Sequence, residues 1–397
     1  NNTPTRVNGF MMLRASRRIY DTLLCRRQMH EFRVLPKTRE ILAGIREGNR
    51  ARLAEAITLV ESKNLEKSHQ AQWLLTKLLS QRSKERQLGL LKPSFRIGLS
   101  GPPGAGKSTL IETFGQLLTS KGFKVAVLAV DPSSARTGGA ILGDKTRMIK
   151  LATDPNAYIR PSPSSGTLGG VTRGTNEAIL LCEGTGYDIV LVETVGVGQS
   201  EVAVSDMVDM FVLVLSPAGG DELQGMKKGI VEMADLIVIN KADGDLLAPA
   251  IRMQTEYTSA LKLIRKKSNL WTPQVWRISS TTKVGIEEMW SIMDNFWKTM
   301  EASGDIQRVR QGQSKKWLWS HINWELVNRF RMQPGLDEQI AAMEKMVVAG
   351  SLPAGSAAEI LLDKFFAVRN TNAGPSRASN FATVELNELL DQPPTAR

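Results

Sequence analysis

The chain has 397 residues, of which 42% are hydrophobic and 23% charged, a composition typical of a globular protein with about two to three domains. Its cysteines, Cys25 and Cys182, are too few for a disulfide framework, and three histidines without His-x-x-His or Cys-x-x-Cys spacing argue against a structural zinc site. No apolar run reaches the roughly 20 residues that a membrane-spanning helix needs, so we predict no integral membrane protein.

The net charge of +11 is confined to one end of the chain. Residues 1–94 hold 19 Lys and Arg against 8 Asp and Glu, whereas residues 95–397 hold 32 of each kind. A protein that binds nucleic acid more often carries its basic stripe on the main domain. We therefore predict no nucleic-acid partner.

The first 37 residues have the composition of a targeting segment. Residues 1–30 contain six arginines and a single acid, Asp21, interleaved with apolar residues. Arginine-rich, acid-poor, amphipathic composition is the profile of an organellar transit peptide. The alternative is a disordered basic arm. We predict a transit or disordered segment over residues 1–37.

Three further regions follow in chain order. Residues 38–92 have helical apolar spacing. Residues 93–286 alternate short apolar runs with helical stretches, which predicts a mostly parallel sheet flanked by helices, an α/β fold. Residues 287–366 return to helical spacing and hold five tryptophans, which are more typical of core or interface than of a cofactor pocket. Residues 367–397 are polar and are predicted to be disordered.

The strands of the α/β region are expected at short apolar runs, most of which are apolar throughout. Such runs are typical of strands buried on both faces. The predicted strands are 95–100, 125–130, 189–193, 210–215, 236–240 and 275–278.

A complete phosphate-binding loop follows the first of these strands. It consists of Gly101, Pro102, Pro103, Gly104, Ala105, Gly106, Lys107, Ser108 and Thr109. Glycines let backbone N–H groups turn toward phosphates, and the following helix adds partial positive charge. Lys107 is predicted to reach the β- and γ-phosphates, and the Ser108 hydroxyl to ligate Mg²⁺. The alternative, a glycine-rich turn, does not explain the strand before it and the helix after it.

A second strand ends in a carboxylate, Glu193, followed three residues later by Gly196. We predict that Glu193 acts on Mg²⁺ directly or through water, and that the Gly196 N–H contacts the γ-phosphate. The alternative is an ordinary strand-to-loop exit. Small GTPases place a glutamine directly after this glycine to orient the attacking water. Here that position is Val197, and Gln199 lies two residues further on.

A later strand runs into Asn240, Lys241 and Asp243 in an Asn-Lys-x-Asp pattern. A carboxylate at Asp243 accepts hydrogen bonds from N1–H and the 2-amino group of guanine, two donors that adenine lacks. The strand after it ends in three hydroxyl residues whose backbone is predicted to contact the guanine oxygen: Ser279, Ser280 and Thr281. The order of these motifs favours GTP over ATP.

These residues and several longer strings resemble one family. The matching strings are 101–109, 130–134, 142–148, 160–170, 193–201 and 219–225, and the likeness runs from about residue 40 to 366. The chain is similar to the P-loop GTPases of the SIMIBI class, metallochaperone-related branch, and within it to the chaperones of adenosylcobalamin-dependent methylmalonyl-CoA mutase. Bacterial members of that family were once labelled arginine/ornithine transport kinases.

The resemblance implies roles that spacing alone does not assign. Asp131 and Asp144 match acidic residues around Mg²⁺ and the γ-phosphate, and the resemblance adds Asp144 to the catalytic set of Lys107, Glu193 and Gln199. Read without the family, Asp131 is equally a helix cap and Asp144 a solvated loop acid. The segment 219–228 resembles a switch loop that passes nucleotide state to the mutase. Read alone, it is a flexible loop.

The resemblance also implies a partner and a place. The partner is methylmalonyl-CoA mutase, the cofactors are GTP or GDP and Mg²⁺, and the location is the mitochondrial matrix. Residues 93–286 become the GTPase domain and 287–366 a segment for homodimerisation. No Asp-x-His-x-x-Gly pattern is present, so no direct cobalamin site is predicted. We expect slow intrinsic hydrolysis accelerated by the partner, because no arginine finger is identifiable. Four basic residues are candidates: Arg136, Lys145, Arg147 and Arg173.

Three alternatives stay open at this point. A metallochaperone for nickel, cobalt or zinc would need a Cys-rich or His-rich handoff motif. A P-loop small-molecule kinase would need an acceptor pocket and would have little use for Asn-Lys-x-Asp. A scaffold that binds nucleotide without hydrolysis would not need the Mg²⁺ ligands.

Overall fold

The computed structural model describes residues 33–62, 64–130, 148–160, 168–194, 199–217, 228–264 and 267–371, without the side chains of residues 65, 168–172, 199–201, 228 and 367–371. Residues 372–397 of the predicted tail and residues 1–32 of the predicted transit segment lie outside this part. The described chain divides into two units at residue 330, and each is described by itself. No described helix has the length and apolarity that crossing a bilayer requires.

The first unit, residues 34–329, is built around a seven-stranded sheet. Its strands are β1 (Phe95–Ser100), β2 (Val125–Val130), β3 (Ala157–Arg160), β4 (Ile189–Thr194), β5 (Met210–Leu215), β6 (Leu236–Ile239) and β7 (Gln274–Arg277). They lie in the order β3-β2-β4-β1-β5-β6-β7 and every neighbouring pair is parallel. The predicted α/β fold with a parallel sheet is confirmed, and β3 is a strand that the apolar runs did not predict.

Helices precede, connect and follow the strands. They are α2 (Pro36–Arg46), α3 (Arg50–Val60), α4 (Leu65–Gln87), α5 (Lys107–Ser120), α7 (Ile149–Thr153), α8 (Leu168–Gly184), α9 (Gln199–Ser205), α11 (Lys228–Met233), the short 3-10 helix η2 (Gly244–Leu246), α12 (Leu247–Leu261), α13 (Ile286–Ala302), α14 (Asp305–Arg331), α15 (Leu336–Val348) and α16 (Ala354–Thr371).

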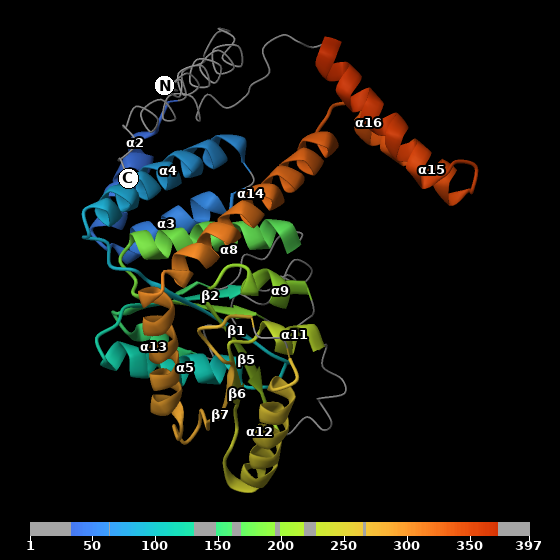
Figure 1. The fold of residues 1–397 in the computed structure, drawn as a ribbon. Coiled ribbons are helices and arrows are strands. Elements are labelled where there is room, and N and C mark those ends of the chain that lie inside the picture. The colour runs from blue at the N-terminus through green and yellow to red at the C-terminus, as the bar shows by residue number, and fades with distance from the viewer. Residues whose placement is uncertain are drawn as a thin grey trace, which may run out of the picture. The chain divides into compact units, whose positions relative to one another are not determined.

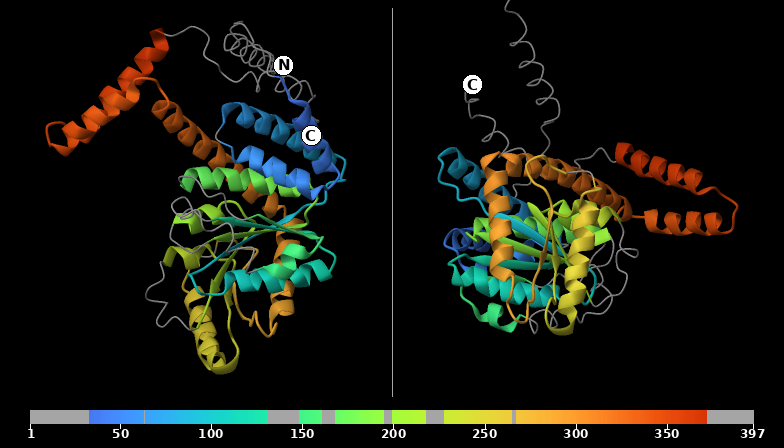
Figure 2. Two further views of the ribbon diagram at one scale, coloured as in Figure 1. Left: turned by 180° about the vertical axis from the view of Figure 1, so that it is seen from behind. Right: turned by 60° about the horizontal axis from the view of Figure 1, so that its bottom comes forward.

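Successive strand residues point to opposite faces of the sheet, and both faces are covered. In β2, Val125 and Val127 join one apolar cluster while Ala126, Leu128 and Val130 join the other. Burial on both faces is the physical reason that these strands read as unbroken apolar runs. Figures 1 and 2 show α3, α4 and α8 over one face and α5 and α13 over the other.

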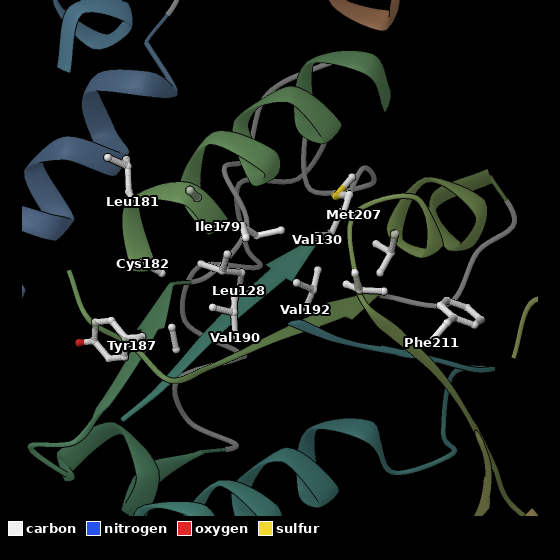
Figure 3. Packing of buried hydrophobic residues seen from close by; sticks show 14 of the residues in the cluster. Leu128, Val130, Ile179, Leu181, Cys182, Tyr187, Val190, Val192, Met207 and Phe211 are labelled. Atoms are coloured by element: carbon white, nitrogen blue, oxygen red, sulfur yellow. The ribbon is translucent and has the colours of Figure 1, made fainter. Parts of the chain in front are cut away.

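Helix α8 packs on β2 and β4 along the first of these faces. Ile179 and Cys182 point from the helix toward Leu128 and Val190 of the strands, and all four are buried (Figure 3). The Cys182 thiol is fully enclosed, and burial raises its pKa above the ordinary value. It is therefore an inert core residue.

Helix α13 belongs to the opposite face and carries aromatic contacts to the sheet. The rings of Phe95 and Trp297 lie 4.8 Å apart, and Trp271 meets Phe296 edge-on at 5.1 Å. Met293 is fully buried in the same cluster. The helix at the start of the predicted C-terminal segment thus contributes to the core beside the sheet.

The first part of α14 is bonded to the turn between α9 and β5. The Gln313 amide donates to the carbonyl of Val208 at 2.7 Å, and the indole N–H of Trp317 donates to that of Asp206 at 3.0 Å. The turn lies directly against β1, because a Cβ at Gly98 would lie 3.0 Å from the Val208 side chain. The absence of a side chain at Gly98 therefore makes room for Val208 against the strand.

A buried ion cluster lies at the end of β1 away from the phosphate loop. The Glu183 carboxylate accepts hydrogen bonds from the Arg96 guanidinium at 2.6 and 2.9 Å and pairs with Arg82 and Arg310 at 3.5 and 3.6 Å. Arg310 also holds Asp209 with two bonds of 2.6 and 2.7 Å. The cluster thereby joins α4, α8, β1 and α14.

The second unit contains the helical pair α15 and α16. Phe330 and Phe365 approach with ring centroids 5.4 Å apart, and Leu336, Ala357 and Phe365 are buried. This pair begins within the predicted C-terminal helical segment 287–366, and α16 extends beyond its predicted end to Thr371, into the predicted tail.

Candidate functional site

The phosphate loop is shaped by three glycines in conformations that other residues rarely adopt. Gly101, Gly104 and Gly106 have φ of 151°, 85° and 87°. A Cβ at Gly101 would lie 1.9 Å from the carbonyl oxygen of Val214, so the loop approaches β5 backbone to backbone. Only glycine meets both demands at position 101.

Helix α5 begins directly from this loop. Gly106 is its N-cap and supplies no side-chain acceptor, so N–H groups of the first turn face the loop and suit an anion. The Lys107 ammonium is buried and donates to the carbonyls of Gly101 and Pro102 at 2.6 and 3.0 Å. Those bonds hold the side chain back over the loop, on the side where phosphates would lie.

The parallel pairing of β1 and β4 brings Glu193 beside this loop. Leu99 is in register with Glu193, and the Ser108 hydroxyl donates to the Glu193 carboxylate at 2.9 Å. The hydroxyl and the carboxylate oxygens are hard ligands of the kind that Mg²⁺ binds, and they lie close together. The residues present therefore fit a magnesium ion. Within the described ranges no cluster of three His, Cys, Asp or Glu side chains forms by itself.

Four other predicted site residues lie wholly or partly outside the described part. Asp131, Asp144 and Gly196 fall in the segments 131–147 and 195–198. Gln199 is the first residue of α9, and its side chain is not described. The roles assigned to these residues stay predictions.

The Asn-Lys-x-Asp motif lies at the carboxyl end of β6 and bonds to both neighbouring loops. The Asn240 amide donates to the carbonyls of Ala105 and Gly106 at 3.0 and 3.3 Å. Its oxygen accepts from the N–H and hydroxyl of Ser280 at 3.1 and 2.8 Å. Lys241 has φ of 58°, a left-handed conformation that non-glycine residues adopt at a cost, commonly at ligand sites.

The Asp243 carboxylate is held by a neighbouring hydroxyl. Ser279 donates to it, and the Thr282 N–H donates in turn to the Ser279 hydroxyl at 3.0 Å. Ser279 and Ser280 are buried, whereas Thr281 is exposed. The structure thus brings Asn240, Asp243 and the loop after β7 to the edge of the sheet that also carries the phosphate loop.

Among the candidate arginine fingers, Arg173 is engaged elsewhere. Its guanidinium pairs with Glu177 at 3.5 Å and lies 5.1 Å from the centre of the Trp324 ring. This arrangement ties α8 to α14. The other three candidates, Arg136, Lys145 and Arg147, lie outside the described ranges.

One residue of the site, Thr113, was not predicted from the sequence. The Thr113 hydroxyl, on α5, donates to the carbonyl of Ser280 at 2.9 Å. No spacing rule announces such a bond, because a helical threonine ordinarily bonds to its own helix.

Comparison with known proteins identifies the family. Residues 53–335 match the family model described as "Methylmalonyl Co-A mutase-associated GTPase MeaB". The chain is 59% identical over 326 residues to the mitochondrial methylmalonic aciduria type A homolog of Mus musculus, covering 82% of this chain and 79% of that protein. It is 50% identical over 289 residues to the GTPase ArgK of Escherichia coli, covering 73% and 85%.

A solved structure agrees with these matches. The crystal structure titled "LAO/AO transport system kinase" has a TM-score of 0.63 and 36% identity, covering 85% of this chain and 99% of the other. The resemblance predicted from the motifs is confirmed.

Proposed function

The chain belongs to the family of methylmalonyl-CoA mutase-associated GTPases, and from that premise we propose that it is a GTP-hydrolysing chaperone of methylmalonyl-CoA mutase. It gates the loading of the adenosylcobalamin cofactor, keeps inactive cobalamin out and helps to eject damaged cofactor. Its relatives from Mus musculus and Caenorhabditis elegans are named mitochondrial. The chain works in the mitochondrion, and we place it in the matrix.

The phosphates lie in the curl of residues 101–109. Backbone N–H groups at the start of α5 and the Lys107 ammonium hold the β- and γ-phosphates, and Lys107 leaves its bonds to the loop carbonyls to do so. This assignment is supported by the φ values of the three glycines and by the buried position of Lys107.

Ser108 and Glu193 hold the magnesium ion, with Asp131 and Asp144 completing the site. When bound, the ion neutralises charge that develops on the phosphates. Glu193 keeps the Ser108 hydroxyl oriented. The Gly196 N–H contacts the γ-phosphate, and Gln199 orients the attacking water. Since Val197 occupies the place where small GTPases carry glutamine, we expect slow hydrolysis in the absence of the mutase.

Guanine is selected by Asp243, with Asn240 and Lys241 beside it and the backbone of residues 279–281 at the guanine oxygen. The observation that carries the proposal is the hydrogen-bonded joining of the base motif to the phosphate loop through Asn240. A kinase of small molecules that uses ATP has no need of a carboxylate braced by Ser279 at this place.

Calorimetry tests the nucleotide assignment. We expect the purified chain to bind GDP and GTP with Mg²⁺ and to bind ADP and ATP far more weakly. Asp243→Asn replaces the acceptor with an amide, so guanine affinity should fall while xanthine nucleotides, which carry an oxygen in place of the 2-amino group, gain. Equal binding of ATP, or consumption of ATP with a small acceptor, would refute a GTPase and favour a kinase.

Partner dependence tests the chaperone role. The nucleotide states differ in their γ-phosphate and Mg²⁺ contacts, and that difference biases loops that a partner can read. We expect GTP turnover to rise several-fold when the mutase is added, and capture of the mutase from mitochondrial extract to depend on the bound nucleotide. An unchanged rate with saturating mutase would contradict a nucleotide cycle that the mutase controls.

We propose that the chain itself forms a homodimer. Helix α14 exposes large apolar side chains: Leu318 is 60%, Trp319 65% and Val327 53% exposed. Such residues are costly on a free surface and typical of an interface. Sedimentation should give twice the 43.7 kDa chain mass. Trp319→Asp should give monomers, whereas Leu263→Asp, at a loop leucine that is 89% exposed, should not.

A further inference from the structure

The hydroxyl of Thr113 links two parts of the site that are far apart in sequence. Thr113 lies on α5, six residues after Lys107, and its hydroxyl donates to the carbonyl of Ser280 at 2.9 Å. Ser280 belongs to the loop after β7, at the predicted base site. The helix that begins at the phosphates thus also reaches the loop proposed to meet the guanine.

The hydroxyls of several other helical threonines in the described part of the chain bond to carbonyls of their own helices, as for Thr58, Thr76, Thr119, Thr255 and Thr258. Thr38 is a second exception, because its hydroxyl donates to the Gln70 side chain of α4 at 2.8 Å. Local bonds of that kind are the default in helices because the acceptor is always in reach. Thr113 gives up the local acceptor for one that is 167 positions away.

The bond closes a ring around the site. Asn240 donates to the carbonyls of Ala105 and Gly106 and accepts from Ser280. Thr113 then returns from Ser280 to α5, which begins at Lys107. The base loop is therefore fixed to the phosphate loop at two points, one through Asn240 and one through Thr113.

Because of peptide geometry, the hydrogen bond from Thr113 to Ser280 also determines the direction in which the next N–H points. The carbonyl of Ser280 and the N–H of Thr281 belong to one planar trans peptide, so they point in opposite directions. With the carbonyl held toward α5, the N–H of Thr281 points away from that helix. It donates to no acceptor in the described part of the chain.

We propose that Thr113 is a positioning residue for guanine recognition. By holding the Ser280 carbonyl, it orients the Thr281 N–H as a donor to the carbonyl oxygen of the purine and keeps Ser279 against Asp243. The inference rests on the proposed guanine-nucleotide function and deepens it by naming a residue that no motif contains. Its role is exerted through Ser280, to which its hydroxyl donates.

The test compares three variants of the full chain. Thr113→Val keeps the shape and removes the donor, and Thr113→Ser keeps the donor. Thr119→Val is the matched control, since it removes a hydroxyl on the same helix that bonds only to Gln116 at 3.2 Å. Affinities for GDP and ADP are measured by calorimetry, and steady-state GTP hydrolysis gives kcat and KM.

Losing one hydrogen bond of this kind is expected to weaken GDP binding roughly three- to tenfold in Thr113→Val. KM for GTP should rise by a similar factor while kcat stays unchanged, because the phosphates remain in place. ADP has an amino group in place of the oxygen, so its weak affinity should not change. Thr113→Ser should restore GDP binding, and Thr119→Val should bind as the wild type does.

Wild-type GDP affinity in Thr113→Val would overturn the inference, as would an equal loss of GDP and ADP binding or a loss shared with Thr119→Val. In those cases the wild-type preference for guanine stands, and with it the proposed function. A wild-type chain without guanine preference would overturn the proposed function and this inference together.

Discussion

Glu177 and Glu183 are buried on the same helix, α8, and their surroundings shift their pKa values in opposite directions. Burial raises the pKa of Glu177, and the attraction of Arg173 offsets it only in part. Burial acts on Glu183 in the same sense, but the charges of Arg96, Arg310 and Arg82 outweigh it and hold its pKa at about 2. The neighbouring charges outweigh the effect of burial at Glu183, and they do not at Glu177.

Glu183→Gln is therefore expected to destabilise the fold by about 3–5 kcal/mol at neutral pH, because it leaves buried arginines without their counter-charge. Urea unfolding of the nucleotide-free chain measures this. The folded pKa lies below the ordinary 4.5, so the charge contributes fully above that pH and its contribution is lost as pH falls toward 2. The difference in the free energy of unfolding between wild type and variant should become smaller as the pH falls from 4.5 toward 2. A difference that is constant with pH would contradict the role of charge.

Glu177→Gln is expected to have the opposite sign, with stabilisation by about 1 kcal/mol at neutral pH. A raised folded pKa means that the wild type loses stability as pH rises through that pKa, and the neutral amide avoids this loss. Arg173 keeps its contact with Trp324 in the variant. Thermal unfolding should show the gain above pH 4.5 and its disappearance in more acidic buffer. A variant less stable than wild type at every pH would show that the Arg173 pair dominates.

Gly101→Ala is expected to abolish nucleotide binding and to destabilise the chain by several kcal/mol, since the new Cβ overlaps the Val214 carbonyl. Gly104→Ala is the matched control, because it shares the positive φ but has nothing within 4 Å of the added carbon. That control should cost about 1–2 kcal/mol from its left-handed backbone. Calorimetry with GDP and urea unfolding measure the nucleotide affinity and the stability of both variants. Equal losses in both would mean that the positive φ, and not the overlap with Val214, causes the effect.

Ser108→Ala is expected to raise the Mg²⁺ concentration for half-maximal GTP hydrolysis about tenfold, the equivalent of one hydrogen bond to a charged group. GDP binding measured in a chelator should match the wild type, because the phosphates do not need this hydroxyl. Ser100→Ala is the control: its hydroxyl accepts from Thr194 at 3.0 Å and has no described bond to Glu193. Unaltered Mg²⁺ dependence in Ser108→Ala would remove Ser108 from the metal site.

The sequence was a good guide to the strands of the sheet because burial on both faces makes them continuously apolar. Strand β3, Ala157–Arg160, was missed because its apolar residues number only three and are followed at once by Arg160 and Pro161, so no long apolar run marks it. The phosphate and base motifs were readable because the ligand constrains their residue types and spacing.

The contacts between the motifs could not be predicted from the sequence. Arg96 and Glu183 are 87 positions apart, and Thr113 and Ser280 are 167 positions apart. Nothing in either local pattern selects the partner, since an arginine or a threonine satisfies many acceptors. Arg173 shows the same limit, because its position suggested a free cation and its pairing with Glu177 depends on the fold.

The enclosure of Cys182 has a practical consequence for spectroscopy. A thiol that is fully covered and resists ionisation does not react with maleimide dyes at neutral pH. Replacing Cys25 would therefore leave a chain whose native sulfhydryl is silent. Single cysteines placed along the exterior of α12 and α14 could then each carry one fluorophore, and energy transfer would follow the molecule through its catalytic cycle without altering the core.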